Sequence, residues 1–162
     1  MQLLVILQLL VLVFVANGTP VIVKRVWRQR FSYPIDCGVK FFDGQRLLGP
    51  SKTMRGVLSS VLVTSACAPL VGLEWKIGAW VGSAAMAGDL FSSFVKRRLG
   101  LAPSSRATGL DQIPESLFPL ISCRSMLALT VADIAMGVVL FFIGEVVLSR
   151  LLYRLRVRGH PY

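Results

Sequence analysis

The chain has very few of the side chains on which most metal and catalytic sites depend. It has one histidine, His160, and three cysteines, Cys37, Cys67 and Cys123, whose spacing forms no pair. A zinc centre needs closely spaced cysteine and histidine ligands, and a Ser-His or Cys-His catalytic unit needs a histidine near its nucleophile. The sequence therefore indicates neither of these sites, and it indicates no disulfide framework.

Acidic residues are also scarce, with 8 Asp and Glu against 18 Lys and Arg, a net charge of +10. The positive charge does not indicate a nucleic-acid partner, because aromatic residues are not interleaved with the basic ones as on a base-stacking surface. Hydrophobic residues make up 54% of the 162 residues, and the mean hydropathy is +0.67. Such an apolar chain is typical of integral membrane proteins.

Long apolar stretches predict five transmembrane helices, near 1–23, 56–73, 77–95, 113–128 and 134–153. The first stretch is long enough to cross about 30 Å of hydrocarbon. Its basic cluster follows the apolar run, whereas a secretory signal has one before it, so we expect a retained helix with its N-terminus outside. We therefore expect one transmembrane domain, residues 1–162, with no room for a separate soluble domain.

The basic residues favour one orientation of these spans. If residues 24–55, 96–112 and 150–162 are cytoplasmic, they hold 16 of the 18 lysines and arginines, in agreement with the positive-inside rule. Only Lys76 and Arg124 then lie toward the outer side. The expected protein is an all-α, multi-pass protein of the cell membrane with a cytoplasmic C-terminus and two cytoplasmic loops.

Asp89 is the most informative residue, because it lies seven positions before Lys96 in the third expected span. A carboxylate at that depth costs about 2.5–3.5 kcal/mol on insertion scales, which makes it a candidate functional residue. On a helix it shares a face with Ser92 and Lys96. Asn17 lies seven positions before Lys24, so Asn17 and Asp89 should line one polar cavity open to the cytoplasm. The alternative is a buried Asp–Asn hydrogen bond that only joins two helices.

Two basic groups lie where the expected loops meet the membrane. Lys52, Thr53 and Arg55 belong to GPSKTMRG, just before the second span. Free N–H groups and cations at a helix start suit phosphate binding, although the P-loop pattern is absent. The second group is KRR at 96–98. The alternatives are a solvated basic loop for the first group and an ordinary topology signal for the second.

Carboxylates complete a set suited to phosphoryl or nucleotidyl transfer, in which catalysis is mostly positioning and charge neutralisation. Asp89 and Asp111 can offer the hard oxygen ligands that Mg²⁺ prefers, with substrate phosphates completing the shell. Capping of the fourth helix would also explain Asp111. Glu145 could be a structural pair or a substrate contact, whereas Asp133 is interpreted as structural. Four cations could hold a polyphosphate: Lys52, Arg55, Lys96 and Arg97.

Four segments resemble a known family: ANG at 16–18, FFDGQRLLGPSKTMRG at 41–56, GDLFSSFVKRRLG at 88–100 and GLDQ at 109–112. In order and spacing they are similar to the motifs of the CDP-archaeol synthases, small membrane cytidylyltransferases related to the CDP-diglyceride synthases. The resemblance covers nearly the whole chain. It implies five transmembrane helices and two cytoplasmic loops that bind CTP with Mg²⁺. It also implies that CTP and a lipid phosphate react to give a CDP-lipid and pyrophosphate.

The resemblance implies roles for individual residues. Asp89, Asp111 and Lys96 would be catalytic, with the metal held near the two carboxylates to neutralise charge on the α-phosphate and the leaving pyrophosphate. Asn17 would line the cleft. The nucleotide phosphates would contact five residues: Lys52, Thr53, Arg55, Lys96 and Arg97.

Two positions depart from the family pattern. Met54 stands where the family commonly has tryptophan, and Pro114 stands where it often has aspartate. Either Glu115 supplies that carboxylate to the metal from a shifted position, or the metal shell differs here. The lipid could carry ether-linked isoprenoid chains or be a diacyl phosphatidate, and a homodimer is left open. The competing hypothesis is a non-enzymatic membrane protein whose basic cytoplasmic face binds anionic lipid head groups.

Overall fold

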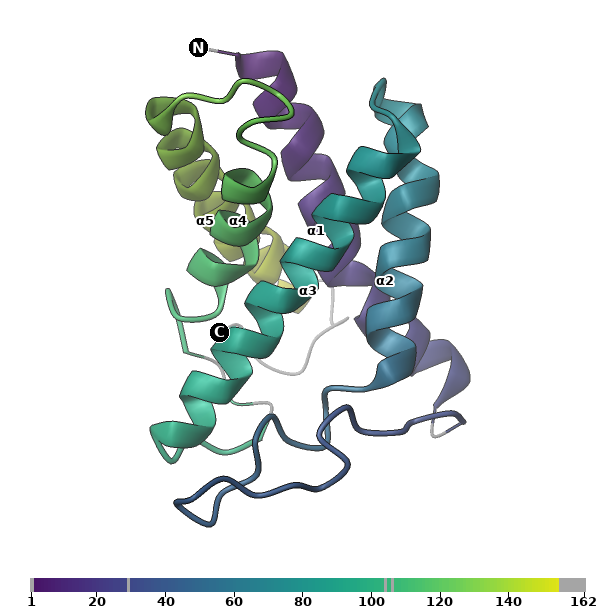
Figure 1. Ribbon diagram of the computed structural model, residues 1–162, viewed down its shortest axis with the longest axis vertical. Coiled ribbons are helices and arrows are strands. Elements are labelled where there is room, and N and C mark those ends of the chain that lie inside the picture. Colours follow the sequence, from purple (N-terminus) through teal and green to yellow (C-terminus); the bar gives the residue numbers. More distant parts are fainter. Residues whose placement is uncertain (1, 29, 104, 106, 155–162) are drawn as a thin grey trace.

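A computed structural model shows a bundle of five α-helices and one short 3₁₀ helix (Figure 1). The structure describes residues 2–154 except 29, 104 and 106. No strand lies within this part of the chain, although two isolated β-bridges occur in the loop before the second helix. In chain order the helices are α1 (Leu3–Trp27), α2 (Met54–Cys67), η1 (Ala68–Val71), α3 (Trp75–Arg98), α4 (Gln112–Ser122) and α5 (Val131–Arg154).

Three helical segments among the described residues are long and apolar enough to cross a membrane: Leu3–Trp27, Met54–Val71 and Val131–Ser149. α3 has 24 residues, but Asp89 and the small polar residues around it lower its mean hydropathy, so α3 is not one of these three segments. α4 has 11 residues. At 1.5 Å per residue it extends about 16 Å, roughly half of the hydrocarbon thickness. The all-helical membrane class is thus confirmed, and the number and orientation of the spans stay predictions.

α4 ends at Ser122, six residues before the expected end of the fourth span, and residues 123–128 form turns. Arg124 interrupts the apolar run directly after the helix. At the start of α5, Asp133 accepts hydrogen bonds from Thr130 and, across the bundle, from the backbone N–H of Gln2. The structural interpretation of Asp133 is confirmed, because its carboxylate joins the N-terminal ends of α1 and α5.

Small residues allow α3 to pack closely against two neighbours. A Cβ atom at Gly78 would lie 2.6 Å from the carbonyl oxygen of Thr64 in α2. Gly82, four positions on, faces the same helix, so the GxxxG spacing is used inside the chain. A Cβ at Gly88 would overlap the backbone carbonyl of Pro114 in α4. This last contact brings the residue after Gly88, Asp89, next to the first turn of α4.

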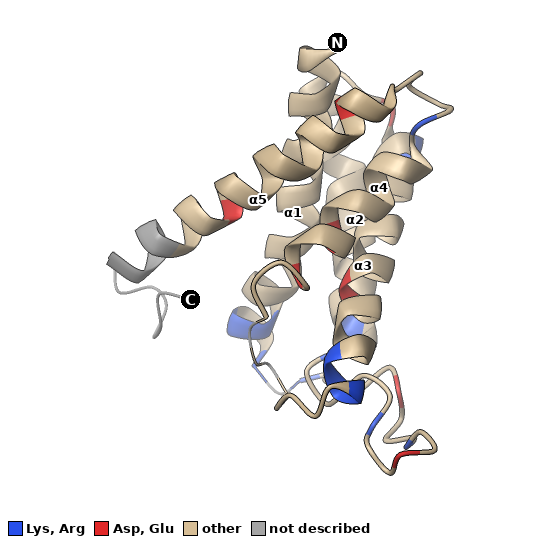
Figure 2. Cartoon of the chain, turned by 90° about the vertical axis from the view of Figure 1, so that its left-hand side faces the viewer, with Lys and Arg blue, Asp and Glu red and all other residues tan. Residues whose placement is uncertain are grey.

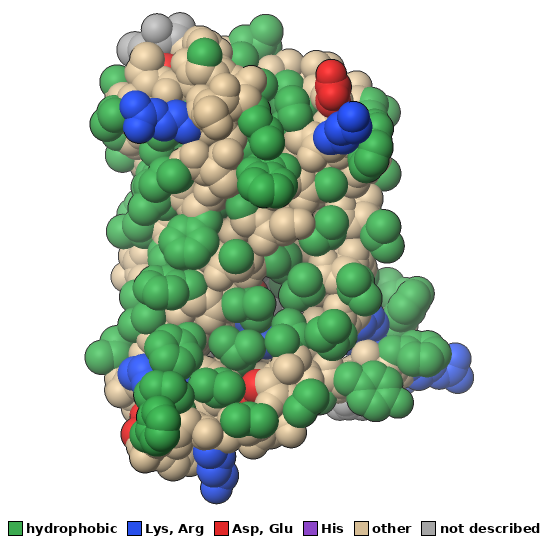
Figure 3. Space-filling view, viewed as in Figure 1, with side chains coloured by type: hydrophobic (Ala, Val, Ile, Leu, Met, Phe, Trp, Pro, Cys, Tyr) green, Lys and Arg blue, Asp and Glu red, His purple; other side chains and the backbone are tan. Residues whose placement is uncertain are grey.

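The apolar core lies toward the N-terminal half of α1, where Ile6, Leu9 and Val13 are buried against α4 and α5 residues such as Leu120 and Phe141. Charged residues gather mainly at the opposite end, where α1 and α3 finish and α2 begins (Figure 2). Apolar side chains cover much of the face between the two charged ends (Figure 3). A band of this kind is typical of a surface that contacts lipid.

Candidate active site

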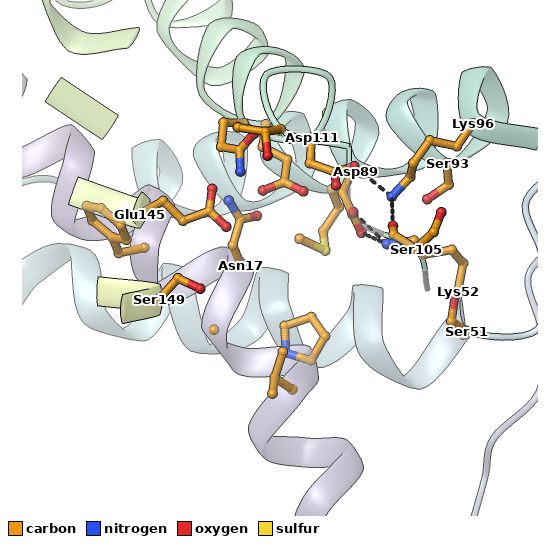
Figure 4. A pocket seen from close by; sticks show the side chains of 18 of the residues that line it. Asn17, Ser51, Lys52, Asp89, Ser93, Lys96, Ser105, Asp111, Glu145 and Ser149 are labelled. Carbon is orange, nitrogen blue, oxygen red and sulfur yellow. Dashed lines mark hydrogen bonds and ion pairs between the residues drawn. The ribbon is translucent and has the colours of Figure 1, made fainter. Parts of the chain in front are cut away.

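A cavity of about 440 Å³ opens at the basic end of the bundle (Figure 4). It is lined by α1, α3, α4 and α5 and by the loops that precede α2 and α4. Its size lies in the usual range for ligand sites. It brings together seven of the nine residues that the sequence predicts for the site: Asn17, Lys52, Asp89, Lys96, Arg97, Asp111 and Glu115. The other two, Thr53 and Arg55, line a smaller adjoining cavity of about 80 Å³, which Lys52 and Asp89 also line.

The first charged pair of the cavity joins α3 to the loop before α2. The ammonium nitrogen of Lys52 lies 2.5 Å and 2.6 Å from the two carboxylate oxygens of Asp89. The backbone holds Lys52 in place, because its carbonyl accepts a hydrogen bond of 2.9 Å from the N–H of Ile35. The next residue, Thr53, caps α2 by accepting a hydrogen bond from the N–H of Gly56. About a fifth of each charged side chain stays accessible, so a ligand can reach the pair.

The second charged pair joins α3 to the loop before α4. Lys96 lies 2.6 Å from an oxygen of Asp111 and also donates to the carbonyl of Ser105. Asp111 stands at the start of α4, but its side chain makes no cap there; it accepts the N–H of Ala107 instead. Capping therefore does not account for this residue. Arg97 donates to the carbonyl of Ala102 in the same loop, so α3 organises the loop through two successive cations.

Carboxylates gather on the inner side of the cavity. The side chain of Glu115 interacts electrostatically with Asp89 and Glu145, and with Lys52 as the counter-charge. Asn17 lies near Glu145 in Figure 4. Both polar atoms of its amide are buried and make no hydrogen bond to any described residue. The shared cavity of Asn17 and Asp89 is thus confirmed, and the alternative of a hydrogen bond between them is wrong.

Arg55 is nearly buried, and its guanidinium donates to the carbonyls of Arg28 and Arg30 beyond the end of α1. Arg55 therefore joins the first turn of α2 to the first residues of the loop that precedes this helix. Its predicted contact with phosphate, like that of Thr53, stays a prediction.

The three basic residues at the end of α3, at positions 96–98, have two different surroundings. Lys96 and Arg97 line the cavity, whereas Arg98 points away from it. The Arg98 guanidinium lies over the rings of Phe41 and Phe94, 4.7 Å and 5.0 Å from their centroids, and forms an ion pair of 3.1 Å with Asp43. Arg98 therefore fastens the loop before α2 onto α3.

Helical spacing explains why Lys96 and Arg97, which the sequence predicts for the site, line the cavity and Arg98 does not. Residues 89, 93, 96 and 97 follow the pattern i, i+4, i+7, i+8 of a single face, and position 98 does not. The same spacing identifies Ser93 as the cavity-lining serine. Ser92, which the sequence placed on the same helix face as Asp89, is fully buried, and its hydroxyl donates to the carbonyl of Gly88. Glu145 and Ser149 also line the cavity, and the sequence left the role of Glu145 open.

The carboxylates of the cavity could bind a divalent cation that a ligand binds at the same time. Among the described residues, no group of three or more acidic, histidine or cysteine side chains is close enough to hold a metal ion without help. Asp89 and Glu115, however, are adjacent carboxylates with a single lysine as counter-charge. Mg²⁺ is commonly bound by one or two carboxylates and completed by water and substrate phosphates. The cavity therefore suits a metal–phosphate ligand better than a metal ion alone.

Fold and site together define a helical membrane protein with a polar cavity, at its basic end, that suits a phosphate ligand. Comparison with known proteins agrees. The chain matches the model of the family described as CarS-like CDP-archaeol synthase over residues 1–77 and 73–162. It is 35% identical over 154 residues to the CDP-archaeol synthase of Sulfurisphaera tokodaii, covering 91% of this chain and 89% of that protein. The chain belongs to the CDP-archaeol synthase family.

Two further similarities support this assignment. The CDP-archaeol synthase of Thermofilum pendens is 38% identical over 132 residues, which cover 78% of this chain and 65% of that protein. A solved structure of an intramembrane enzyme for archaeal membrane lipid biosynthesis has a TM-score of 0.75 and 29% identity, and covers 88% of this chain and 90% of the other. The competing hypothesis of a non-enzymatic lipid-binding protein is not supported.

Proposed function

We propose that this protein transfers CMP from CTP to the phosphate of a membrane lipid and releases pyrophosphate. The observation that carries the proposal is the single cavity, in a member of the CDP-archaeol synthase family, that collects two lysine–carboxylate pairs and further cations. An oxygen of the lipid phosphate attacks the α-phosphorus of CTP. The bond between the α-phosphorus and the bridging oxygen of the β-phosphate breaks, and that oxygen leaves with pyrophosphate.

The cations of the cavity neutralise the phosphates during this transfer. Lys52 and Lys96, which each form an ion pair with a carboxylate, exchange that partner for phosphate oxygens when CTP binds, while Arg97 adds a third positive group. Because each lysine is charged and paired before CTP binds, the exchange replaces one charge-assisted contact with another. Such fixed charges act most strongly where negative charge develops, on the α-phosphate and the leaving group.

A divalent cation, which we propose to be Mg²⁺, would supply additional neutralisation of the triphosphate when bound. Asp89 and Glu115, which are adjacent, would hold it together with phosphate oxygens of CTP, and the metal contact of Asp111 stays a separate prediction. The electrostatic contact of Glu115 with Asp89 supports the idea that Glu115 replaces the family aspartate missing at Pro114. Asn17 offers the one amide whose two polar atoms are buried in the cavity without a partner among the described residues, and we propose that it contacts the nucleotide.

The lipid is proposed to be the archaeol-type phosphate implied by the names of the relatives. Its head group would reach the cavity from the inner leaflet of the cell membrane, in a protein of five spans with both substrate loops in the cytoplasm. Two aromatic residues in the lining of the cavity support contact with a lipid: the rings of Phe14 and Phe141 lie with their centroids 4.8 Å apart.

The experiment is release of pyrophosphate by the purified full chain in lipid nanodiscs with Mg²⁺ and CTP. One arm contains an ether-linked isoprenoid phosphate, one contains a diacyl phosphatidate, and one contains no lipid phosphate. We expect release only with a lipid phosphate, faster with the isoprenoid lipid, and none when ATP replaces CTP. Absence of release in every arm, or equal release without lipid phosphate, would refute the proposed function.

A further inference from the structure

Asp36 is a buried carboxylate outside the cavity, in the loop between α1 and α2. Its side chain is completely inaccessible to solvent, and it accepts hydrogen bonds from four residues of this loop. One oxygen accepts the N–H of Gly38 at 3.1 Å and the Arg46 guanidinium at 2.8 Å. The other accepts the N–H groups of Leu48 at 3.3 Å and Gly49 at 2.9 Å. Four donors therefore converge on one carboxylate.

These contacts keep Asp36 ionised. Burial by itself raises the pKa of the Asp36 carboxyl, but the N–H groups of Gly49 and Gly38, the Arg46 guanidinium and the N–H of Leu48 outweigh it and lower the pKa to about 2. A charged group with all its hydrogen bonds made is a rigid anchor, because moving any donor leaves buried charge without a partner.

The anchor lies directly beside the segment that carries Lys52. Leu48 and Gly49, which donate to Asp36, are followed after Pro50 by Ser51 and Lys52, and residues 48, 51 and 52 line the cavity. The residue before Asp36, Ile35, donates its N–H to the carbonyl of Lys52. Asp36 thus holds the start of the segment 48–52, and the preceding residue, Ile35, holds its end.

We propose that Asp36 is a positioning residue for the transfer reaction: it fixes the backbone of segment 48–52 and so places the Lys52 ammonium at the phosphates of CTP. This inference rests on the proposed function and deepens it. Asp36 does not touch the cavity, so its effect passes through Lys52. A small displacement of a group that binds the reacting phosphates can cost up to about 100-fold in rate. The flexible lysine side chain compensates in part, so we expect about a tenfold loss.

A double-mutant cycle separates this role from general stabilisation of the loop. Asp36→Asn, Lys52→Met and the double variant are compared with the wild type by kcat/KM for CTP and by the shift in unfolding temperature that CTP causes. If Asp36 acts through Lys52, Asp36→Asn lowers kcat/KM about tenfold in the wild type, mainly through KM, and less than twofold when Lys52 is already methionine.

Asp43→Asn is the matched control. It removes the same charge from the same loop, but from a carboxylate that is itself exposed. Arg98 keeps its contacts with the Phe41 and Phe94 rings and with the carbonyl of Arg46, so we expect kcat/KM within twofold of the wild type. If Asp36→Asn does not yield folded protein, Arg46→Met removes one donor from the anchor and replaces it in the cycle. An equal loss in both Lys52 backgrounds, or no loss in the wild type, would overturn the positioning role. A wild type without CTP-dependent activity would instead refute the proposed function.

Discussion

Lys52 and Asp89 are 37 positions apart in the sequence, yet the lysine ammonium contacts both oxygens of the carboxylate, at 2.5 Å and 2.6 Å. Lys96 and Asp111 repeat the arrangement at 2.6 Å with the roles of helix and loop reversed. In each pair, α3 supplies one partner and a loop supplies the other. The cavity is therefore close to neutral before a ligand binds, and a metal–phosphate ligand can exchange partners with both pairs.

Replacement of Asp89 tests the role of the carboxylate. We expect Asp89→Asn to lower kcat by roughly 100-fold or more, because it removes a carboxylate that is proposed to hold the metal ion that neutralises the reacting phosphates. The fold should persist, since the lost pair with Lys52 is partly accessible and its removal also relieves repulsion with Glu115. Pyrophosphate release and thermal unfolding measure the two effects. Turnover within tenfold of the wild type would show that Asp89 is not catalytic.

Replacement of Lys96 tests the proposed phosphate contact. Lys96→Met should weaken CTP binding by about tenfold to 100-fold, since a hydrogen bond to a charged group contributes about 1.5–3 kcal/mol. Calorimetric titration in the presence of Mg²⁺ measures the affinity. Lys76→Met is the control, because Lys76 lies exposed at the first turn of the same helix, far along α3 from the cavity. Equal affinities of the two variants would remove Lys96 from the phosphate site.

Replacement of Gly88 tests the close contact between α3 and α4. In Gly88→Ala the new methyl group meets the backbone carbonyl of Pro114, which no side-chain rotation can move away. Overpacking of this kind costs about 1–3 kcal/mol, so the unfolding temperature should fall. Gly18→Ala is the matched control for stability, because a Cβ there meets no atom within 4 Å. A Gly88→Ala protein as stable as the Gly18→Ala protein would contradict the packing.

The pKa of Asp36 gives stability a defined dependence on pH. The folded-state pKa of about 2 lies below the ordinary value of 3.8. The contribution to the free energy of unfolding is therefore complete above about pH 4 and is lost as the pH falls toward 2; at neutral pH it amounts to about 2 kcal/mol. Asp36→Asn should lower the unfolding temperature at pH 7 and flatten its decline between pH 4 and pH 2. An unchanged decline in this variant would contradict the assignment.

Removal of divalent metal should separate activity from folding. A chelator should abolish CTP-dependent turnover, and added Mg²⁺ should restore it. The unfolding temperature of the nucleotide-free protein should stay unchanged, because lysines already neutralise Asp89 and Asp111 and the described residues offer no all-protein metal cage. Thermal unfolding with and without chelator measures this. A large drop on chelation would indicate a structural metal that the account does not contain.

The sequence predicted the cavity because helices have a fixed rise. Counting seven residues from Asn17 to Lys24 and from Asp89 to Lys96 placed both polar residues at one depth, and they do line one cavity. The short α4 was not predictable from hydropathy, since residues 126–129 are apolar but lie in turns and in the irregular connection to α5.

Loop contacts account for most of what the sequence did not predict. Arg55 and Arg98 bind to the loop before α2, and Asp36 holds that loop together, through contacts that depend on its folded path. No periodicity describes such a path, because it is set by turns and by individual hydrogen bonds. The contacts of Arg55 and Arg98 with this loop could therefore not be predicted from the sequence.

Transfer of label from CTP to lipid tests the central claim most directly. The wild-type protein in nanodiscs that contain an isoprenoid ether-lipid phosphate is given CTP labelled at the α-phosphorus or, in parallel, at the γ-phosphorus. The account predicts that α-label appears in the lipid and γ-label appears only in pyrophosphate. Retention of the α-label in water-soluble products, or appearance of the γ-label in the lipid, would contradict it.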